Sequence, residues 1–256
     1  MMKPVILLVD DNKEILDFIE SNLIDLYEVV KTYNGMQALD YLKENTIRLI
    51  VSDVMMPGMD GFELCRQVKS DVELSHLPIV LLTAKDTLQA KLEGLELGAD
   101  AYIEKPFSPK HLKTQIANLL ANRNKIKTYF ANSPFAHITS IAHTKEDERF
   151  LESLNRIILE HIQETELDVE RLARYMNMSR PTFYRKIKAI SDLTPNELIS
   201  LTKLKKAAEL LAEESHNIHT VSEVVGYSSV RVFVRNFQKQ FGLTPLEYIH
   251  SHKTKS

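Results

Sequence analysis

The stretch Leu49–Gly61, with the sequence LIVSDVMMPGMDG, decides the fold of the first half of the chain. Strand-forming residues lead directly into Asp53, and a Pro-Gly turn follows within five residues. Open α/β sheets bind ligands at the carboxyl ends of their strands. Asp10 and Asp11 end an earlier apolar run in the same way. Three carboxylates held together repel one another unless a cation lies among them, and hard oxygen ligands suit Mg²⁺.

Residues 1–124 alternate short apolar runs with amphipathic segments. We expect strands at Val5–Val9, Tyr27–Thr32, Leu49–Asp53, Pro78–Thr83 and Ala101–Ile103, and helices at Lys13–Ser21, Met36–Glu44, Gly61–Ser70, Thr87–Leu97 and Pro109–Ala121. The strands lack apolar-polar alternation, so both faces of the sheet should be buried. This pattern predicts an α/β fold with a five-stranded parallel sheet covered by helices.

Two further strand ends carry polar groups. Thr83 ends the fourth strand, and Lys105 follows the fifth. With the acidic cluster they would form a phosphoryl-binding site, in which the metal and Lys105 neutralise oxygens and Thr83 donates a hydrogen bond. Each residue alone has a plainer explanation: Asp10-Asp11 or Thr83 could be caps, and Lys105 could be solvated. Their joint placement at strand ends favours the site.

These motifs resemble the receiver domain of two-component response regulators, over about Pro4–Ala121. The matching residues are Val9-Asp10-Asp11, Asp53–Gly61, Leu82-Thr83-Ala84, Gly98–Tyr102 and Lys105-Pro106-Phe107. The resemblance implies a flavodoxin-like fold in which Asp53 accepts a phosphoryl group from a histidine kinase. It also implies Mg²⁺ held by Asp11, Asp53 and the Met55 carbonyl with Asp10 assisting, a cis Lys105-Pro106 bond, and a switch pair, Thr83 and Tyr102.

Charge divides the chain into two halves. Residues 1–124 hold 13 Lys and Arg against 19 Asp and Glu, whereas residues 125–256 hold 19 against 16. Only the second half is therefore expected to meet polyanions. The longest apolar runs are too short to span a bilayer, and no leader opens the chain. A single cysteine, Cys65, fits a reducing compartment, so we expect a cytoplasmic protein without direct membrane contact.

We expect a receiver domain at 1–124, a linker at 125–147 and a second domain at 148–256. The last receiver helix continues in pattern toward Phe130, and Arg123 breaks its apolar spacing. Either the residues beyond the receiver form only a linker, or the helix extends into a dimer contact that involves Ile126 and Phe130.

The second domain is predicted to be all helical and contains a weak internal repeat. Leu193-Thr194-Pro195 with Glu197 recurs fifty residues later as Leu243-Thr244-Pro245 with Glu247. Upstream, each copy has a short helix, a tight turn and a second helix, with Ala173 or Ser222 where two helices approach. This is a helix-turn-helix, whose second helix can enter the major groove of DNA.

The outer faces of the two second helices are basic. We expect DNA contacts from Arg180, Thr182, Tyr184, Arg185 and Lys188 in the first copy and from Arg231, Arg235, Gln238 and Lys239 in the second. The second helix of the first copy also offers Lys186. Phe183, Ile187, Phe233 and Phe237 should point inward. A single basic helix would more often be a solvated face of a bundle, but two copies favour DNA binding.

The second domain resembles the AraC-type DNA-binding domain over about Glu148–His250. The most specific residues are Gly226-Tyr227, Arg235-Asn236-Phe237 and Phe241–Pro245, and a long helix from Pro195 to Leu211 would join the two copies. One departure is Asn177, where the family has glycine in the first turn. Asparagine tolerates a left-handed backbone better than most residues.

Together, the two resemblances imply a transcription factor whose promoter binding is controlled by phosphorylation of Asp53. It would work with a histidine kinase, either separate or part of the same parent polypeptide, and with double-stranded DNA, and dimerise on phosphorylation. The alternative is a signalling module whose helical half binds protein. A metal-dependent phosphatase would need a second acid beside Asp53, where Val54-Met55 stand instead. We therefore expect a phosphoacceptor with slow self-dephosphorylation rather than an enzyme.

Overall fold

The computed structural model describes residues 3–84, 97–164, 167–213 and 217–253. The chain forms two compact units, Met1–Asn124 and Lys125–Ser256. Helix α5 (Pro109–Asn132) begins in the first unit and ends in the second. Among the described residues, no helix has both the length and the apolar character needed to cross a membrane.

The first unit contains the expected parallel sheet. Its strands are β1 (Val5–Val9), β2 (Glu28–Thr32), β3 (Leu49–Asp53), β4 (Ile79–Thr83) and β5 (Ala101–Glu104), in the order β2-β1-β3-β4-β5. Every neighbouring pair is parallel. The direction of strand order reverses at β1, so the carboxyl ends of β1 and β3 meet at the position where such sheets bind ligands.

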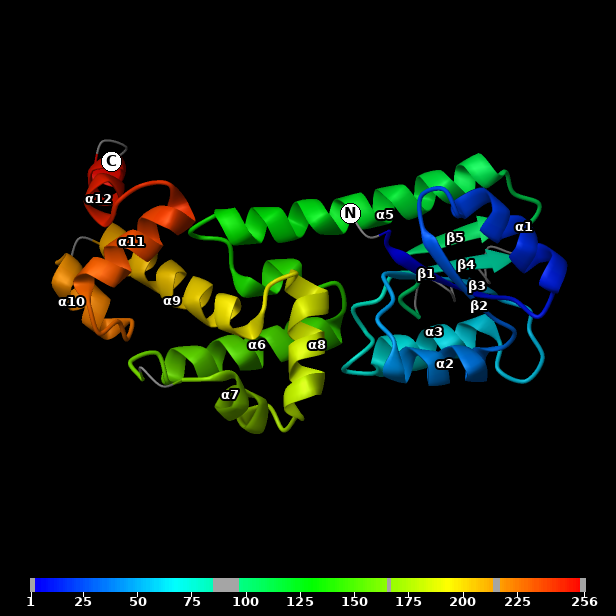
Figure 1. Cartoon of the computed structure of the whole chain (residues 1–256), viewed down its shortest axis with the longest axis horizontal. Helices are drawn as coiled ribbons and strands as arrows, with labels where there is room; N and C mark the ends of the chain where they lie inside the picture. Colours follow the sequence, from blue (N-terminus) through cyan, green and yellow to red (C-terminus); the bar gives the residue numbers. More distant parts are fainter. Residues whose placement is uncertain (1–2, 85–96, 165–166, 214–216, 254–256) are drawn as a thin grey trace. The chain divides into compact units, whose positions relative to one another are not determined.

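Helices cover both faces of this sheet (Figure 1). Helix α1 (Lys13–Leu23) and the first part of α5 pack on one face, and α2 (Gly35–Glu44) and α3 (Gly61–Ser70) on the other. Both faces of the strands are therefore buried, which explains why their sequences do not alternate. The helix expected at Thr87–Leu97 lies mostly outside the described residues.

The second unit is helical throughout its described part. Its elements are the 3-10 helix η1 (Ile138–Ile141) and the helices α6 (Lys145–Glu160), α7 (Val169–Tyr175), α8 (Arg180–Ser191), α9 (Pro195–Ala212), α10 (Ile218–Val224), α11 (Val230–Phe241) and α12 (Pro245–Lys253). Two apolar clusters form the core, one around Phe183 and one around Phe233. Helix α9 contributes Leu201 to the first and Leu204 to the second, and so joins the two copies (Figure 1).

Residues 125–147, which we expected to be a linker, take part in the second unit. They comprise the end of α5, η1 and the start of α6. Phe130, Ile138 and Ile141 are buried in the first apolar cluster. Because Phe130 is 1% exposed, it cannot contribute to a dimer contact in this conformation, and that expectation is corrected. Ile126 remains partly exposed.

Candidate functional site

Three aspartates meet at the carboxyl ends of β1 and β3. Oxygens of Asp10, Asp11 and Asp53 all lie within 4.8 Å of one another, and the side chains of Asp10 and Asp53 are buried. The cap of α1 is Asn12, whose side chain accepts hydrogen bonds from the backbone N–H groups of Glu14 and Ile15. Asp10 and Asp11 are therefore not explained as the cap of this helix.

Lys105, which follows β5, contacts two of these carboxylates. Its Nζ lies 2.9 Å from Asp53 Oδ1 and 3.0 Å from Asp10 Oδ2. The Lys105-Pro106 peptide bond is cis, as the resemblance implied. Burial raises the pKa of Asp53, although Lys105 opposes this shift. Burial alone would lower the pKa of Lys105, but its hydrogen bonds to Asp53 and Asp10 outweigh burial and raise it.

The charges of this cluster do not balance. One ammonium group faces three carboxylates, of which one, Asp11, is exposed to solvent. An oxygen-rich donor set that is partly open to water is the kind of site that Mg²⁺ occupies, because this ion retains several water ligands. The residues therefore fit a divalent cation.

The backbone around Asp53 is closely packed. A Cβ atom on Gly61 would lie 2.2 Å from the Asp53 carbonyl oxygen, so only glycine lets α3 begin this close to the end of β3. Asp60 caps α3 by accepting a hydrogen bond from the Glu63 N–H at 2.8 Å. Between these elements, the Met55 side chain is 54% exposed. The turn sequence thus fixes the rim of the site.

The two residues expected to form a switch pair lie on neighbouring strands. Thr83, at the end of β4, is fully buried. The hydroxyl oxygen of Tyr102, on β5, is buried and has no hydrogen-bond partner among the described residues. A buried hydroxyl group without a partner is unfavourable. The role of Thr83 and Tyr102 as a switch pair stays a prediction.

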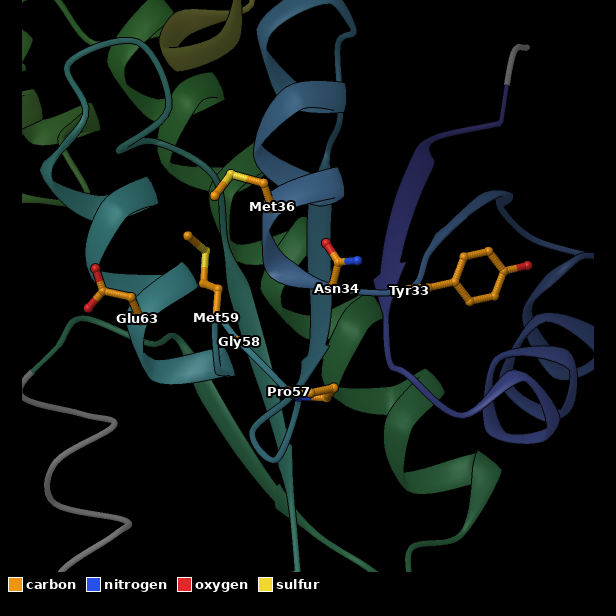
Figure 2. A pocket seen from close by; sticks show the side chains of 7 residues that line it. All are labelled: Tyr33, Asn34, Met36, Pro57, Gly58, Met59 and Glu63. Carbon is orange, nitrogen blue, oxygen red and sulfur yellow. The ribbon is translucent and has the colours of Figure 1, made fainter.

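A shallow pocket of about 550 Å³ lies beside this rim (Figure 2). Its lining comprises Tyr33, Asn34, Met36, Pro57, Gly58, Met59 and Glu63. Met36 comes from α2, and Met59 from the loop that precedes α3. Met59 packs so closely on Gly35 that a Cβ there would lie 2.7 Å from its Cγ. The pocket contains none of the three aspartates, and sequence reasoning did not identify it.

In the second unit, the side chains proposed to contact DNA face away from the core. Those of Arg180, Tyr184, Arg185, Lys188, Arg231, Arg235, Gln238 and Lys239 are exposed, and that of Thr182 is half-buried. The opposite faces of the same helices bury Phe183 and Ile187 in α8, and Phe233 and Phe237 in α11. The predicted inward and outward faces are therefore present in both copies.

Lys186, which shares the spacing of the basic face of α8, is buried instead, and so are two lysines of α9. Lys186 of α8 is fully buried, and its Nζ lies 2.5 Å from Asp147 Oδ1. On α9, Lys203 Nζ donates to the Glu164 carbonyl at 3.2 Å, and Lys205 Nζ to the Ala136 carbonyl at 3.1 Å. The partners of all three lysines lie 39 or more residues away along the chain, so local sequence patterns do not reveal them.

The turns and caps explain the repeat. Asn177 and Gly226 occupy the two turns with φ of 53° and 72°, so asparagine does adopt the left-handed backbone here. Thr194 and Glu197 form a capping box at the start of α9, and Thr244 and Glu247 make the same hydrogen bonds before α12. The recurring Leu-Thr-Pro motif is thus a repeated helix start.

Comparison with known proteins finds two families along the chain. Residues 6–117 match the response regulator receiver domain, and residues 172–251 match a helix-turn-helix domain. "Histidine kinase P4" of Formosa agariphila is 40% identical over 246 residues, which are 96% of this chain and 18% of that protein. "Probable transcriptional regulator ycf27" of Porphyra purpurea is 39% identical over 146 residues, 57% of this chain and 58% of that protein.

A solved structure is similar to part of the chain. The receiver domain of a signal transduction histidine kinase from Syntrophus aciditrophicus shares 33% sequence identity, with a TM-score of 0.45, over 46% of this chain and 91% of that one. This chain covers less than two thirds of the length of either relative named above.

Proposed function

We propose that this chain, which has a response regulator receiver domain followed by an AraC-type helix-turn-helix domain, binds DNA under the control of phosphorylation of Asp53. The two domains support a DNA-binding transcription factor. The observation that carries the proposal is the contact of Lys105 with both Asp53 and Asp10 in a cluster of three aspartates, in one chain with two exposed basic helices.

The proposed reaction moves a phosphoryl group from a histidine of a kinase to Asp53. The bond between phosphorus and the histidine nitrogen breaks, and one between phosphorus and an Asp53 carboxylate oxygen forms. Lys105 would neutralise the phosphoryl oxygens, and the Thr83 hydroxyl would donate a hydrogen bond. Asp10, Asp11, Asp53 and the Met55 carbonyl would hold Mg²⁺, which supplies further neutralisation of charge. Hydrolysis of the acyl phosphate would be slow.

The phosphoacceptor is tested with a small phosphodonor and Mg²⁺. One phosphoryl group should be added to the wild-type protein, and Asp53→Asn should take up none. Asp40→Asn is the matched control, because Asp40 is an exposed aspartate that only pairs with Lys43 on the surface of α2. Uptake by Asp53→Asn at the wild-type rate would show that the acceptor is another residue.

The two recognition helices, α8 and α11, would lie in successive major grooves on one face of the duplex, about 34 Å apart. Each chain would then read an asymmetric site, and binding should be strongest on direct repeats. Duplexes selected from random DNA by the full chain, followed by footprinting, test this arrangement. Protection of one groove alone, or failure to enrich any duplex, would favour a helical half that binds protein.

Phosphorylation is further proposed to promote a homodimer through the receiver surface that includes β5 and α5; the predicted helix at Thr87–Leu97, which the same proposal involves, lies mostly outside the described residues. Remodelling of that surface by Thr83 and Tyr102 would be the cause. Sedimentation at micromolar protein, with and without phosphorylation, measures the monomer fraction. An unchanged monomer fraction would contradict this mode of activation, while leaving phosphorylation of Asp53 intact.

A further inference from the structure

The C-terminal ends of α8 and α11 have the same backbone conformation but different residues. The residue that caps the C-terminal end of α8 is Asp192, with φ 61° and ψ 2°, and the residue that caps α11 is Gly242, with φ 78° and ψ −7°. In both, the N–H of the capping residue donates to the carbonyl four residues earlier. Glycine is the usual residue in this left-handed conformation, which is strained for residues with a side chain.

The side chain of Asp192 makes a contact that glycine could not make. Its Oδ2 lies 3.1 Å from Lys127 Nζ, and the same Nζ donates a hydrogen bond of 2.8 Å to the Ala189 carbonyl in the last turn of α8. The side chain of Lys127 is only 9% exposed. A cation at this position also interacts favourably with the C-terminal end of the helix dipole. Lys127 thus holds the end of the first recognition helix.

In the described part of the second copy this contact is missing, because the capping residue, Gly242, has no side chain. A Cβ atom built on Gly242 would meet no other atom within 4 Å. Among the described residues, the position next to the capping residue is therefore open space. The strained aspartate in the first copy is not a requirement of the helix-turn-helix fold itself.

Lys127 comes from the helix that starts in the receiver unit. Helix α5 is continuous from Pro109 to Asn132, and the boundary between the compact units follows Asn124. One turn before Lys127, Arg123 is fixed within the receiver: its guanidinium lies 2.7 Å from Asp100 Oδ1 and also donates to the His76 carbonyl. Residues four apart share one face of a helix. The same face of α5 is thus anchored on both sides of the boundary.

We propose that Lys127 and Asp192 are positioning residues through which α5 conveys the state of the receiver to the first recognition helix, α8. The proposal rests on the proposed function, because it needs a receiver whose phosphorylation alters DNA binding. A shift or rotation of α5 reaches Lys127 through the helix backbone, and the ion pair carries it to the end of α8. Helix α5 also touches α11, where Gln240 Nε2 donates a hydrogen bond of 2.8 Å to the Ala131 carbonyl. The charged contact with the capping residue of the recognition helix belongs to the first copy.

The test measures DNA affinity with and without phosphorylation in the full chain. The probe is a duplex that the wild-type chain has selected from random DNA, and the readout is the ratio of the two dissociation constants. Allosteric coupling of this kind is about 5–150-fold. Asp192→Gly places at this position the residue found in the second helix-turn-helix copy. This variant should fold at least as stably as wild type and bring the ratio of dissociation constants close to one. Lys127→Met should also bring this ratio close to one. The double variant, Asp192→Gly with Lys127→Met, should have the same ratio as either single variant.

Two controls separate positioning from stability. Gly242→Asp places an unpaired aspartate at the matched position, so it should lower the melting temperature but keep the wild-type ratio. Asp192→Asn keeps a short side chain that tolerates the left-handed backbone and removes only the charge; it should lose the response as Asp192→Gly does. Asp192→Gly and Asp192→Asn proteins that respond to phosphorylation within about twofold of wild type would overturn the proposal. A wild-type ratio of one would instead overturn phosphorylation control itself, and this assignment with it.

Discussion

The two helix-turn-helix copies share one architecture but are held together by different interactions. In the first, Lys186 of α8 is buried against Asp147 of α6, and Lys127 of α5 holds the end of the helix. In the second, the equivalent of Lys186 is Asn236, and Phe237 packs with Phe233, Phe241 and Tyr248 at ring distances of 4.9–5.7 Å.

This difference determines what each copy can respond to. A buried ion pair is favourable only in good geometry and leaves an unpaired charge when one partner is lost, whereas aromatic packing leaves no buried charge. The first copy therefore depends on ion pairs with α5 and α6. The second depends mainly on apolar and aromatic packing, and its contact with α5 is an uncharged hydrogen bond from Gln240 to the Ala131 carbonyl. Substitutions should affect the two copies in correspondingly different ways.

The largest effect is expected from breaking the buried ion pair of the first copy. Asp147→Ala leaves Lys186 without its carboxylate in a fully buried position. The free energy of unfolding should fall by about 3–5 kcal/mol, measured by urea denaturation of the full chain. In contrast, the free energy of unfolding should fall much less when Asp147→Leu is combined with Lys186→Met, since no charge then stays buried. Equal losses in both proteins would mean that the pair acts through packing alone.

A smaller difference in stability is expected between substitutions in the two helix-turn-helix turns. Gly226→Ala places a Cβ 2.3 Å from the Ile162 carbonyl oxygen in a left-handed conformation, and should lower stability by about 1–3 kcal/mol. Asn177 occupies the equivalent turn and is exposed, so Asn177→Gly should change stability by no more than about 0.5 kcal/mol. Similar values for the two substitutions would show that the turns are equally constrained. Thermal or urea denaturation measures both.

Local patterns were sufficient for much of the fold. The five strands have lengths and apolar runs that allow few alternatives, and their parallel arrangement is confirmed. The helix-turn-helix repeat was visible because Thr194 and Thr244 each begin a capped helix with a matching glutamate. Interactions across long sequence separations could not be read in this way. Lys186 looked like a solvent-facing residue because its partner Asp147 lies 39 residues earlier, in a segment expected to be a linker.

The receiver site was predictable because its residues end neighbouring strands. Parallel strands bring their carboxyl ends together, so Asp10, Asp53 and Lys105 had to converge, whatever the details of packing. The role of residues 125–147 was not predictable for the opposite reason. Phe130 keeps the helical spacing of α5, but this spacing does not say what covers it, and only the packed second unit shows what buries Phe130 and Ile141.

On DNA, the equivalent arginines of the two copies can be tested in the same way. Arg185→Ala and Arg235→Ala remove exposed side chains from α8 and α11, respectively. If the arginine contacts a guanine in two hydrogen bonds, its removal should weaken the binding free energy by about 1–3 kcal/mol and relax the base preference at one position. One that contacts only phosphate should weaken binding on all sequences and reduce the salt slope by about one. Undiminished affinity in the double variant would contradict the model.

The smallest effect concerns pH and Lys205, which supports the first copy from α9. Its ammonium group donates to the carbonyls of Ser133 and Ala136 and lies over the Phe130 ring. Burial lowers the pKa of Lys205 from 10.5 to about 8, although Glu209 opposes the shift. Between pH 8 and about 10 the folded protein therefore binds fewer protons at this residue than the unfolded chain.

Stability must consequently rise with pH in that window, because the unfolded state there carries the extra proton. Below pH 8 the charge is buried in the folded state, and its full cost is present. We expect the free energy of unfolding of wild type, relative to Lys205→Met, to increase by about 1–2 kcal/mol from pH 8 to pH 10. Lys203, whose pKa burial also lowers, is common to both proteins and cancels in the difference. A difference that is flat or falls over this range would show that Lys205 is fully charged in the folded protein.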